Sequence, residues 1–265
     1  MEILTHDPWA AHSLIAERYG EGRIFLAGDA CHLHPPYGGY GMNMGISDAV
    51  DLGWKLAARL RHWGGAQLLA SYERERRAVH RRVIAEAVEN YAAIPQNLVR
   101  RDLEGEGVES DAARQRLAAE ILANKPREFR TLGVVLGYHY SGSPIVVEDG
   151  SAPPEPHFMH YVPSAHPGCL APHLWLADGS SLYDGFGAGF TLLVTAGGAE
   201  DDIEQLRAAA CDLALPLTVF APADNRLRDL CGARLALIRP DQHVAWRGDT
   251  LDRDPRALFD RVRGA

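Results

Sequence analysis

The sequence predicts an α/β protein built from two regions. Two observations indicate this. Short β-favouring runs alternate with stretches in which apolar residues recur at helical spacing, and a proline-rich segment separates an earlier part of the chain from a later one. The 265 residues are 46% hydrophobic and 23% charged, which is enough apolar material for packed cores. A chain of this length suggests one large or two modest domains.

A short strand that ends at a Gly-Asp pair opens the first region. Residues 23–27 form a β-favouring run that stops abruptly at Gly28 and Asp29, as a buried parallel strand does where it reaches a ligand crevice. A polar loop with two prolines and three glycines follows. Apolar residues then recur at helical spacing, and this pattern predicts a helix that begins close to Met42.

Two further helices are expected before the proline-rich segment. Residues 68–91 carry an apolar stripe, and we interpret their charged side chains, Glu86 among them, as a solvated face. The arginines of residues 74–82 could instead bind the phosphates of NADPH, but a charged helix face is the simpler interpretation. A shorter helix over residues 111–123 is expected to stop before Pro126.

The proline-rich segment marks the domain boundary. Prolines recur from residue 144 to residue 172 at a density that forbids helices. We therefore expect a first domain over residues 1–125, a linker over 126–172 and a second domain over 173–265.

The second domain has the element order of a thioredoxin-like fold. The pattern predicts a strand, a helix, three strands and a last helix, over residues 190–195, 203–213, 217–221, 235–239, 243–247 and 255–262. Cys211 is expected inside a helix and Cys231 in a loop, with no neighbouring thiol for a disulfide. This domain is therefore expected to be structural and redox-inert.

Composition excludes several classes of function. The formal net charge of −8 disfavours nucleic acid and anionic membranes as partners. The start of the chain lacks a signal-peptide pattern, and no apolar run reaches the ~18 residues of a membrane span. The four cysteines have no CxxC spacing, so neither a zinc knuckle nor a dithiol is indicated, and a cytoplasmic location is expected.

The loop after the first strand carries the candidate site. Asp29, at the carboxyl end of a strand, can accept hydrogen bonds from polyol hydroxyls, and Gly28 lets a ligand approach the backbone. Gly41 and two earlier glycines allow a tight turn. The backbone N–H groups of Met42 and Asn43 then open a helix whose positive end suits an anionic ring atom or a carbonyl oxygen. Together these residues predict a site for an electron-rich, partly anionic cofactor.

This pattern resembles the flavin-dependent aromatic hydroxylases of the p-hydroxybenzoate hydroxylase superfamily. The residues that carry the resemblance are GDA, His, PP, GxG, N, G, DA, L and WKL, in this order over residues 28–56. The resemblance implies that Asp29 binds the ribityl chain of FAD and that Met42 and Asn43 face the pyrimidine edge of the flavin. It also implies a catalytic role for Pro36, whose carbonyl would lie beside the isoalloxazine and the substrate.

The resemblance extends along most of the chain but not along the whole family. The SYE.ERR pattern of residues 71–77 and the tail over 184–247 resemble the larger members, which act on phenolic, phenylpropionate-like or polyketide substrates and have a thioredoxin-like C-terminal domain. The GxGxxG turn that holds the ADP part of FAD and the substrate-binding sheet are not found in the sequence. The chain is therefore expected to be the C-terminal portion of such a hydroxylase, with the last strand and long helices of an FAD/NAD(P)-binding domain.

The resemblance implies an enzyme with defined partners. The expected activity is hydroxylation of a phenolic or polycyclic aromatic small molecule, with FAD as cofactor, NADPH or NADH as co-substrate, and O2. A second chain would supply the N-terminal half of the FAD and substrate sites, or the chain would form a homo-oligomer. The alternative, from a different class, is a non-catalytic binding or subunit-assembly module.

Simpler interpretations of the same residues stay open. The glycines of residues 38–41 could form a turn without a ligand, and Asp29 could cap that turn. Cys31, His32 and His34 look like a metal cluster, but the sequence pairs no distant cysteine or carboxylate with them. We therefore interpret them as loop residues, with His32 positioning Asp29, and expect no metal site.

Overall fold

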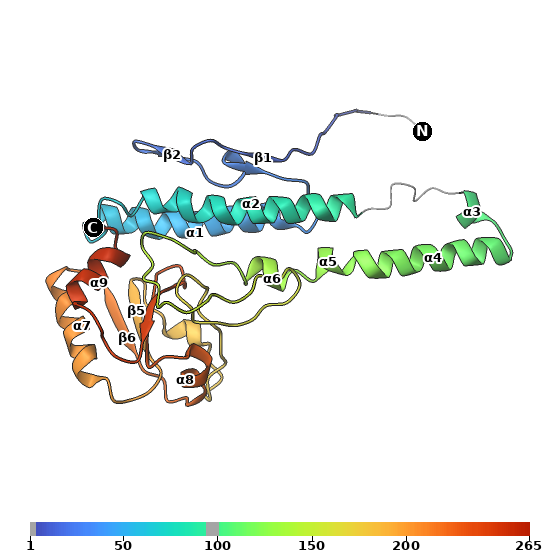
Figure 1. Ribbon diagram of the computed structural model, residues 1–265. Helices are drawn as coiled ribbons and strands as arrows, with labels where there is room; N and C mark the ends of the chain where they lie inside the picture. Colours follow the sequence, from blue (N-terminus) through green and yellow to red (C-terminus); the bar gives the residue numbers. More distant parts are fainter. Residues whose placement is uncertain (1–3, 94–100) are drawn as a thin grey trace. The chain divides into compact units, whose positions relative to one another are not determined.

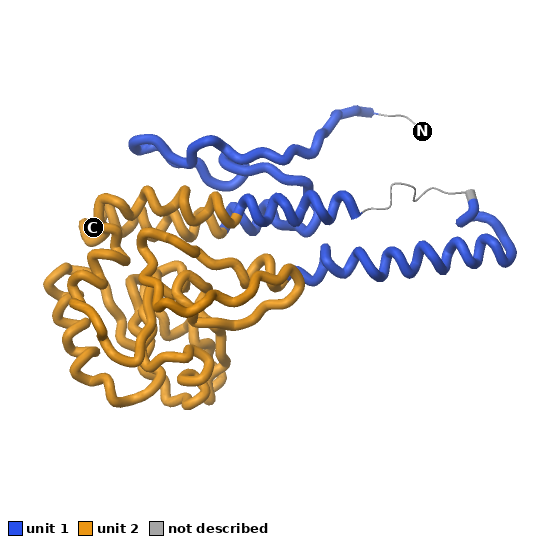
Figure 2. The backbone as a smooth tube through the Cα atoms, viewed as in Figure 1, with its two compact units in different colours: residues 1–46, 80–131 blue, residues 47–79, 132–265 orange. Residues whose placement is uncertain are grey.

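The computed structural model describes residues 4–93 and 101–265, and the chain divides into two compact units (Figure 1, Figure 2). Unit 1 comprises Met1–Ile46 and His80–Thr131, and unit 2 comprises Ser47–Val79 and Leu132–Ala265. The domain boundaries after residues 125 and 172 that the sequence suggests stay a prediction.

Unit 1 contains two small antiparallel sheets. β1 (Leu14–Ile15) pairs with β4 (His32–Leu33), and β2 (Gly20–Glu21) pairs with β3 (Ile24–Phe25). This corrects the expectation of a buried parallel strand over residues 23–27, because β3 is two residues long, lies antiparallel to β2 and leaves Ile24 73% exposed. A parallel strand needs a neighbour reached by a crossover connection. Here the turn at Gly22, with φ at 62°, folds β2 directly onto β3.

Long helices occupy the positions that the apolar spacing predicts. α1 (Tyr40–Leu60), α2 (Ala70–Ala92) and α4 (Val108–Asn124) confirm the three expected helices. The short helix α3 (Arg101–Glu104) precedes α4, and α5 (Pro126–Phe129) begins with a proline, which suits the first helical position. Across residues 4–93 and 101–265, no helix combines the length and the apolar content that a membrane span requires.

Helix α2 buries charged side chains on the face that was expected to be solvated. Within unit 1, Glu86 is 1% exposed and accepts hydrogen bonds of 2.5 and 2.6 Å from Arg127. In the part of α2 that belongs to unit 2, Arg76 is fully buried. The interpretation of the α2 charges as a solvated face is therefore wrong at Glu86, and Arg76 is a further buried charge of the same helix. Helical spacing identifies the apolar stripe, but it does not reveal partners distant in the sequence.

A four-stranded mixed sheet organises unit 2 (Figure 1). Its strands β5 (Phe190–Val194), β6 (Leu217–Phe220), β7 (Leu235–Ile238) and β8 (Val244–Gly248) lie in the order β6-β5-β7-β8. β5 is parallel to β6 and antiparallel to β7. The helix α7 (Glu200–Asp212) connects β5 to β6, and α9 (Pro255–Val262) follows β8. This order confirms the expected thioredoxin-like arrangement.

Short elements fill the remaining connections of unit 2. They are α6 (Leu132–Val135), η2 (Leu182–Gly185) and α8 (Arg226–Cys231). The proline-rich residues 144–172 contain no helix, as expected. Cys231 closes α8 rather than lying in a loop, which corrects the expectation from the sequence. A helix of six residues is too short to display an apolar period.

Both faces of the sheet are buried. Successive side chains of a strand point to opposite faces, so Leu192 packs with Leu206 of α7 on one face while Leu193 packs with Leu227 of α8 on the other. Every residue of β5 and of β7 is buried. The central strands are therefore almost entirely apolar in sequence, with Thr191 as the polar residue of β5.

Serine replacements of two cysteines test the expectation that this sheet domain is redox-inert. Burial raises the pKa of the Cys231 thiol to about 11, which keeps it protonated, and Cys211 is a free, exposed cysteine. We expect Cys211→Ser to leave the free energy of unfolding unchanged and Cys231→Ser to lower it by about 1 kcal/mol. Urea unfolding checks both values. In an enzyme completed by the N-terminal half of the FAD and substrate sites, a large loss of turnover in either variant contradicts a purely structural role.

Candidate cofactor site

A pocket of about 470 Å³ in unit 1 brings together most of the site residues that the sequence suggests. Asp29, Pro36, Gly41 and Met42 all line it. The other lining residues are Trp9, Ala10, His12, His32, Leu33, His34 and Gly39. Gly28 and Asn43 do not line the pocket. Gly28 begins the turn that carries Asp29, and Asn43 donates a hydrogen bond to Gly39, which lines the pocket.

Gly28 sets the approach of the loop to helix α1. Its φ is +59°, which favours glycine, and it begins the 3-10 turn that carries Asp29. A Cβ atom added to Gly28 would lie 3.6 Å from the Cα of Gly45, and one added to Gly45 would lie 3.4 Å from the Cα of Gly28. Two glycines that face each other thus let the Asp29 turn rest closely against the first turns of α1.

The loop between the prolines and α1 is closed by its own hydrogen bonds. The N–H of Gly39 donates to the carbonyl of Pro36 at 3.2 Å, across a turn in which Gly38 and Gly39 have φ of 98° and 66°. The side-chain amide of Asn43 donates to the carbonyl of Gly39 at 3.0 Å. These bonds fix the direction of the Pro36 carbonyl and join the loop to α1.

The pocket lies at the positive end of α1. The first N–H groups of an α-helix lack intrahelical acceptors and carry the positive end of the helix dipole. Gly41 and Met42, in the first turn, line the pocket, Met42 is 75% exposed, and this turn contains no acidic residue. Burial, with a contribution from Glu86, raises the pKa of Tyr40 to about 12. The phenol is therefore neutral and adds no negative charge at this end.

Several lining residues were not identified from the sequence. Trp9 and His12 come from a segment before β1 that has no regular pattern, so no sequence signal marks them. The Nδ1 of His34 donates to the carbonyl of Pro35 at 2.8 Å, which orients this ring. An indole and two further imidazoles, those of His12 and His34, thus join the carboxylate and the helix terminus around one cavity.

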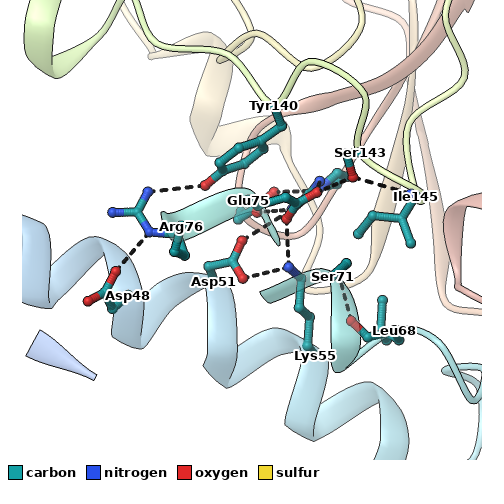
Figure 3. A network of polar contacts seen from close by, with 12 residues as sticks. Asp48, Asp51, Lys55, Leu68, Ser71, Glu75, Arg76, Tyr140, Ser143 and Ile145 are labelled. Atoms are coloured by element: carbon teal, nitrogen blue, oxygen red, sulfur yellow. Dashed lines mark hydrogen bonds and ion pairs between the residues drawn. The ribbon is translucent and has the colours of Figure 1, made fainter. Parts of the chain in front are cut away.

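A network of buried charges is the main polar feature of unit 2 (Figure 3). The Nζ of Lys55 lies 2.6 Å from Asp51 and 2.6 Å from Glu75. Arg239 donates to both oxygens of Glu75, at 2.6 and 2.9 Å, and to Asp241 at 2.6 and 3.0 Å. All five residues are buried. With every group ionised, three carboxylates face two cations, and the network carries one net negative charge.

A second buried pair lies beside this network. Arg76 donates to Asp48 at 2.8 Å and to the hydroxyl of Tyr140 at 3.3 Å (Figure 3). The sequence did not predict this ion pair between α1 and α2. The spacing of Asp51 and Lys55, four residues apart on one helix, is a sequence signal that could have suggested part of the network.

The three carboxyl groups of the network have pKa values that are shifted in different directions. Burial raises the pKa of Asp51 to about 7, and the neighbouring charges of Glu75 and Asp241 add to this rise. Burial acts in the same direction on Glu75 and Asp241, but Arg239 outweighs it and lowers the pKa of both carboxyls. Asp51 is therefore the group that takes a proton when the net negative charge is neutralised.

Two family models match the parts of the chain that contain the pocket and the sheet. Residues 1–87 match the family of FAD binding domains, and residues 164–265 match the C-terminal family of aromatic-ring hydroxylases. The first match contains every residue that lines the pocket, and the second contains the whole thioredoxin-like sheet. The match to FAD binding domains and the fold thus place the chain among flavoproteins. The chain belongs to the family of FAD-dependent aromatic-ring hydroxylases.

Individual relatives agree with this assignment. The chain is 36% identical to the FAD-dependent monooxygenase apdD of Emericella nidulans, over 94% of this chain and 42% of that protein. A structure of native and K252c-bound RebC-10x superposes with a TM-score of 0.90 and 39% identity, over 97% of this chain and 49% of that one. A ternary complex of aklavinone-11 hydroxylase with FAD and aklavinone gives a TM-score of 0.74 and 30% identity, over 97% and 46%.

These relatives are longer than the chain, which spans less than half the length of each of the three. Their names support the hypothesis of a flavin monooxygenase and not the alternative of a non-catalytic module.

The pH dependence of unfolding tests the proton on Asp51. An unfolded aspartate has a pKa of about 3.9, so between about pH 4 and 7 the folded chain binds more protons than the unfolded chain at this position. Stability contributed by this group therefore falls as the pH rises. Asn imitates the protonated acid, so we expect the free energy of unfolding of Asp51→Asn, relative to wild type, to rise by more than about 1 kcal/mol from pH 5.5 to pH 8.

Glu75→Gln is the control for this experiment. The folded pKa of Glu75 is lowered, so its contribution is fully present above the unfolded pKa. We expect this variant to lose about 3–5 kcal/mol at pH 8, as for a broken buried pair, and to lessen the pH dependence, because the charge of Glu75 is one of the causes that raise the pKa of Asp51. Urea titrations at the two pH values measure both differences, and a pH-independent difference for Asp51→Asn contradicts the assignment.

Proposed function

We propose that this chain is part of an FAD-dependent monooxygenase that hydroxylates a phenolic or polycyclic aromatic ring with NAD(P)H and O2. The observation that carries the proposal is the single pocket lined by Asp29, Pro36, Gly41 and Met42. A carboxylate, a fixed carbonyl and a helix N-terminus converge there. The names of the relatives, which include monooxygenases and hydroxylases, support the same reaction class.

The pocket residues suit the flavin and its ribityl chain. Asp29 is exposed at the pocket, where its carboxylate can accept hydrogen bonds from ribityl hydroxyls. The N–H groups at Gly41 and Met42 can donate to a carbonyl oxygen or an anionic nitrogen at the pyrimidine edge. Asn43 supports this turn through its bond to Gly39. The residues present therefore fit the group.

Pro36 is the residue that we place nearest to the chemistry. Its carbonyl is held in direction by the N–H of Gly39, and a carbonyl oxygen has a second lone pair with which to accept a hydrogen bond from a phenolic substrate. When bound, FAD supplies the electron transfer and oxygen activation. The protein orients the ring, and the helix N-terminus stabilises negative charge on it.

The pyrophosphate of FAD needs groups from another polypeptide segment. The dinucleotide fingerprint GxGxxG followed by a helix is not found in this sequence. We propose that a segment with this motif and a substrate-binding sheet completes the site, from a partner chain or a longer form of this one. The four free cysteines fit a reducing cytoplasm, which we propose as the location.

Replacing Asp29 tests the flavin assignment in a completed enzyme. A charge-assisted hydrogen bond contributes roughly 1.5–3 kcal/mol, so we expect Asp29→Ala to lower FAD affinity by about one to two powers of ten. The affinity for the aromatic substrate should change less. Flavin fluorescence after dialysis measures the FAD affinity, with the exposed Asp229→Ala as the matched control. Flavin content equal to wild type in Asp29→Ala contradicts the assignment.

Reconstitution tests the proposed function itself. Alone, the 265-residue chain should hold FAD weakly and consume no NAD(P)H, because the segment that binds the most charged part of FAD is supplied elsewhere. Adding a polypeptide with the fingerprint and the substrate sheet should restore flavin absorbance and aromatic-dependent NAD(P)H consumption. The proposal fails if this addition restores neither. The inference that a second segment is required is contradicted if the chain alone is a stable monomer that binds stoichiometric FAD and turns over NAD(P)H.

A further inference from the structure

Unit 1 contains a buried cluster of a thiol and two imidazoles. Cys31, His32 and His80 each offer a potential metal-ligating atom, and these atoms lie within 4.8 Å of one another. The three residues are only 1 or 2% exposed. From the sequence, Cys31 and His32 were interpreted as loop residues because no distant ligand could be paired with them. The fold supplies one, because α2 brings His80 to the Cys31-His32 pair.

The backbone holds the first two residues firmly. The N–H of Cys31 donates to the carbonyl of Gly28 at 2.9 Å, and the carbonyl of Cys31 accepts from Ala16 at 2.8 Å. His32 lies in β4 and pairs with Ile15 of β1. Both side chains therefore start from backbone that is fixed on two sides.

The third residue is oriented by a buried tyrosine. The hydroxyl of Tyr19 forms a 2.8 Å hydrogen bond with Nδ1 of His80, and Tyr19 is fully buried. The rings of His32 and His80 lie 4.0 Å apart between centroids, tilted by 47°. A hydrogen bond to one ring nitrogen is the usual way in which proteins orient a metal-binding histidine, and here it makes Nε2 the ligand atom of His80.

We propose that Cys31, His32 and His80 bind a zinc-type divalent ion that ties the cofactor loop to helix α2 within unit 1. A thiolate with two imidazoles is a donor set that suits Zn²⁺ and not Mg²⁺ or Ca²⁺, which take oxygen ligands. Ligand atoms lie about 2.0–2.3 Å from a tetrahedral Zn²⁺. The distances between the three ligand atoms, which reach up to 4.8 Å, therefore need to shorten by roughly 1 Å when the ion binds.

Binding exchanges a proton for the metal. The thiol of Cys31 loses its proton to solvent as the sulfur–zinc bond forms, and the two neutral imidazoles bind through nitrogen lone pairs. A tetrahedral ion takes its fourth ligand from water or another side chain. His32 also lines the cofactor pocket, so the ion would hold one pocket wall in place without taking part in the flavin chemistry.

Cobalt spectroscopy of the chain, freed of metal with a chelator, tests this site without FAD. Co²⁺ should give visible tetrahedral bands and a thiolate charge-transfer band at one equivalent, and Zn²⁺ should displace it. Cys31→Ala should abolish the charge-transfer band, and His80→Gln should weaken binding more than Tyr19→Phe, for which we expect about a tenfold loss. Cys231→Ser, a buried thiol outside the cluster, and the exposed His173→Gln should bind as wild type does.

X-ray absorption of the zinc-loaded wild-type chain gives a second measurement that needs no variant. One sulfur and two imidazole nitrogens in the first shell are expected. The proposal is overturned if the wild-type chain binds no Co²⁺ at one equivalent, if the thiolate band survives in Cys31→Ala, or if the zinc shell contains no sulfur. Because no step uses flavin, these outcomes are independent of whether reconstitution yields a monooxygenase.

Discussion

The bidentate ion pair between Glu75 and Arg239 is the contact on which unit 2 depends. It joins helix α2 to the residue that follows β7, across 164 positions of sequence, with both side chains buried. The desolvation of such a pair is offset only when each charge keeps its hydrogen-bonding partners. Lys55 and Asp241 meet this requirement, because each contacts one member of the pair. Where α1 and α2 enter unit 2, their position relative to the sheet follows from this geometry.

Aromatic rings surround the charges and keep the local dielectric low. The guanidinium of Arg239 lies 5.3 Å from the ring centre of Trp54 and 5.0 Å from that of Tyr140. Trp54 in turn contacts Trp63 and Phe190 at the edge of the apolar core. Electrostatic attraction is stronger in such surroundings, and an unpaired charge is correspondingly more costly. The network and the core therefore stabilise each other.

The sequence predicts those parts of the molecule that have a local signal. The helix period identifies α1, α2 and α4, and short β-favouring runs identify β5 and β7, because these patterns arise from burial within single elements. The Gly-Asp pair and the glycine loop locate four of the residues that line the candidate cofactor pocket. Partners distant in the chain leave no such pattern. The pairing of β3 with β2, the burial of Arg76 and the contribution of Trp9 all depend on tertiary contacts that a single sequence does not record.

Because of the buried ion pair, the boundary of the C-terminal family match is not a boundary of independent folding. Residues 164–265 match a family model of their own and contain the complete four-stranded sheet, so by sequence they are a separate unit. Energetically they are not, because Arg239 finds Glu75 and Asp51 only in the helical part of the chain. Cutting the chain at the family boundary would leave a guanidinium in the interior with Asp241 as its remaining carboxylate partner in this network. Matching a family as one block and folding as an independent unit are thus distinct properties, and a copy of this tail in another protein would need the carboxylates of both α1 and α2 to accompany it.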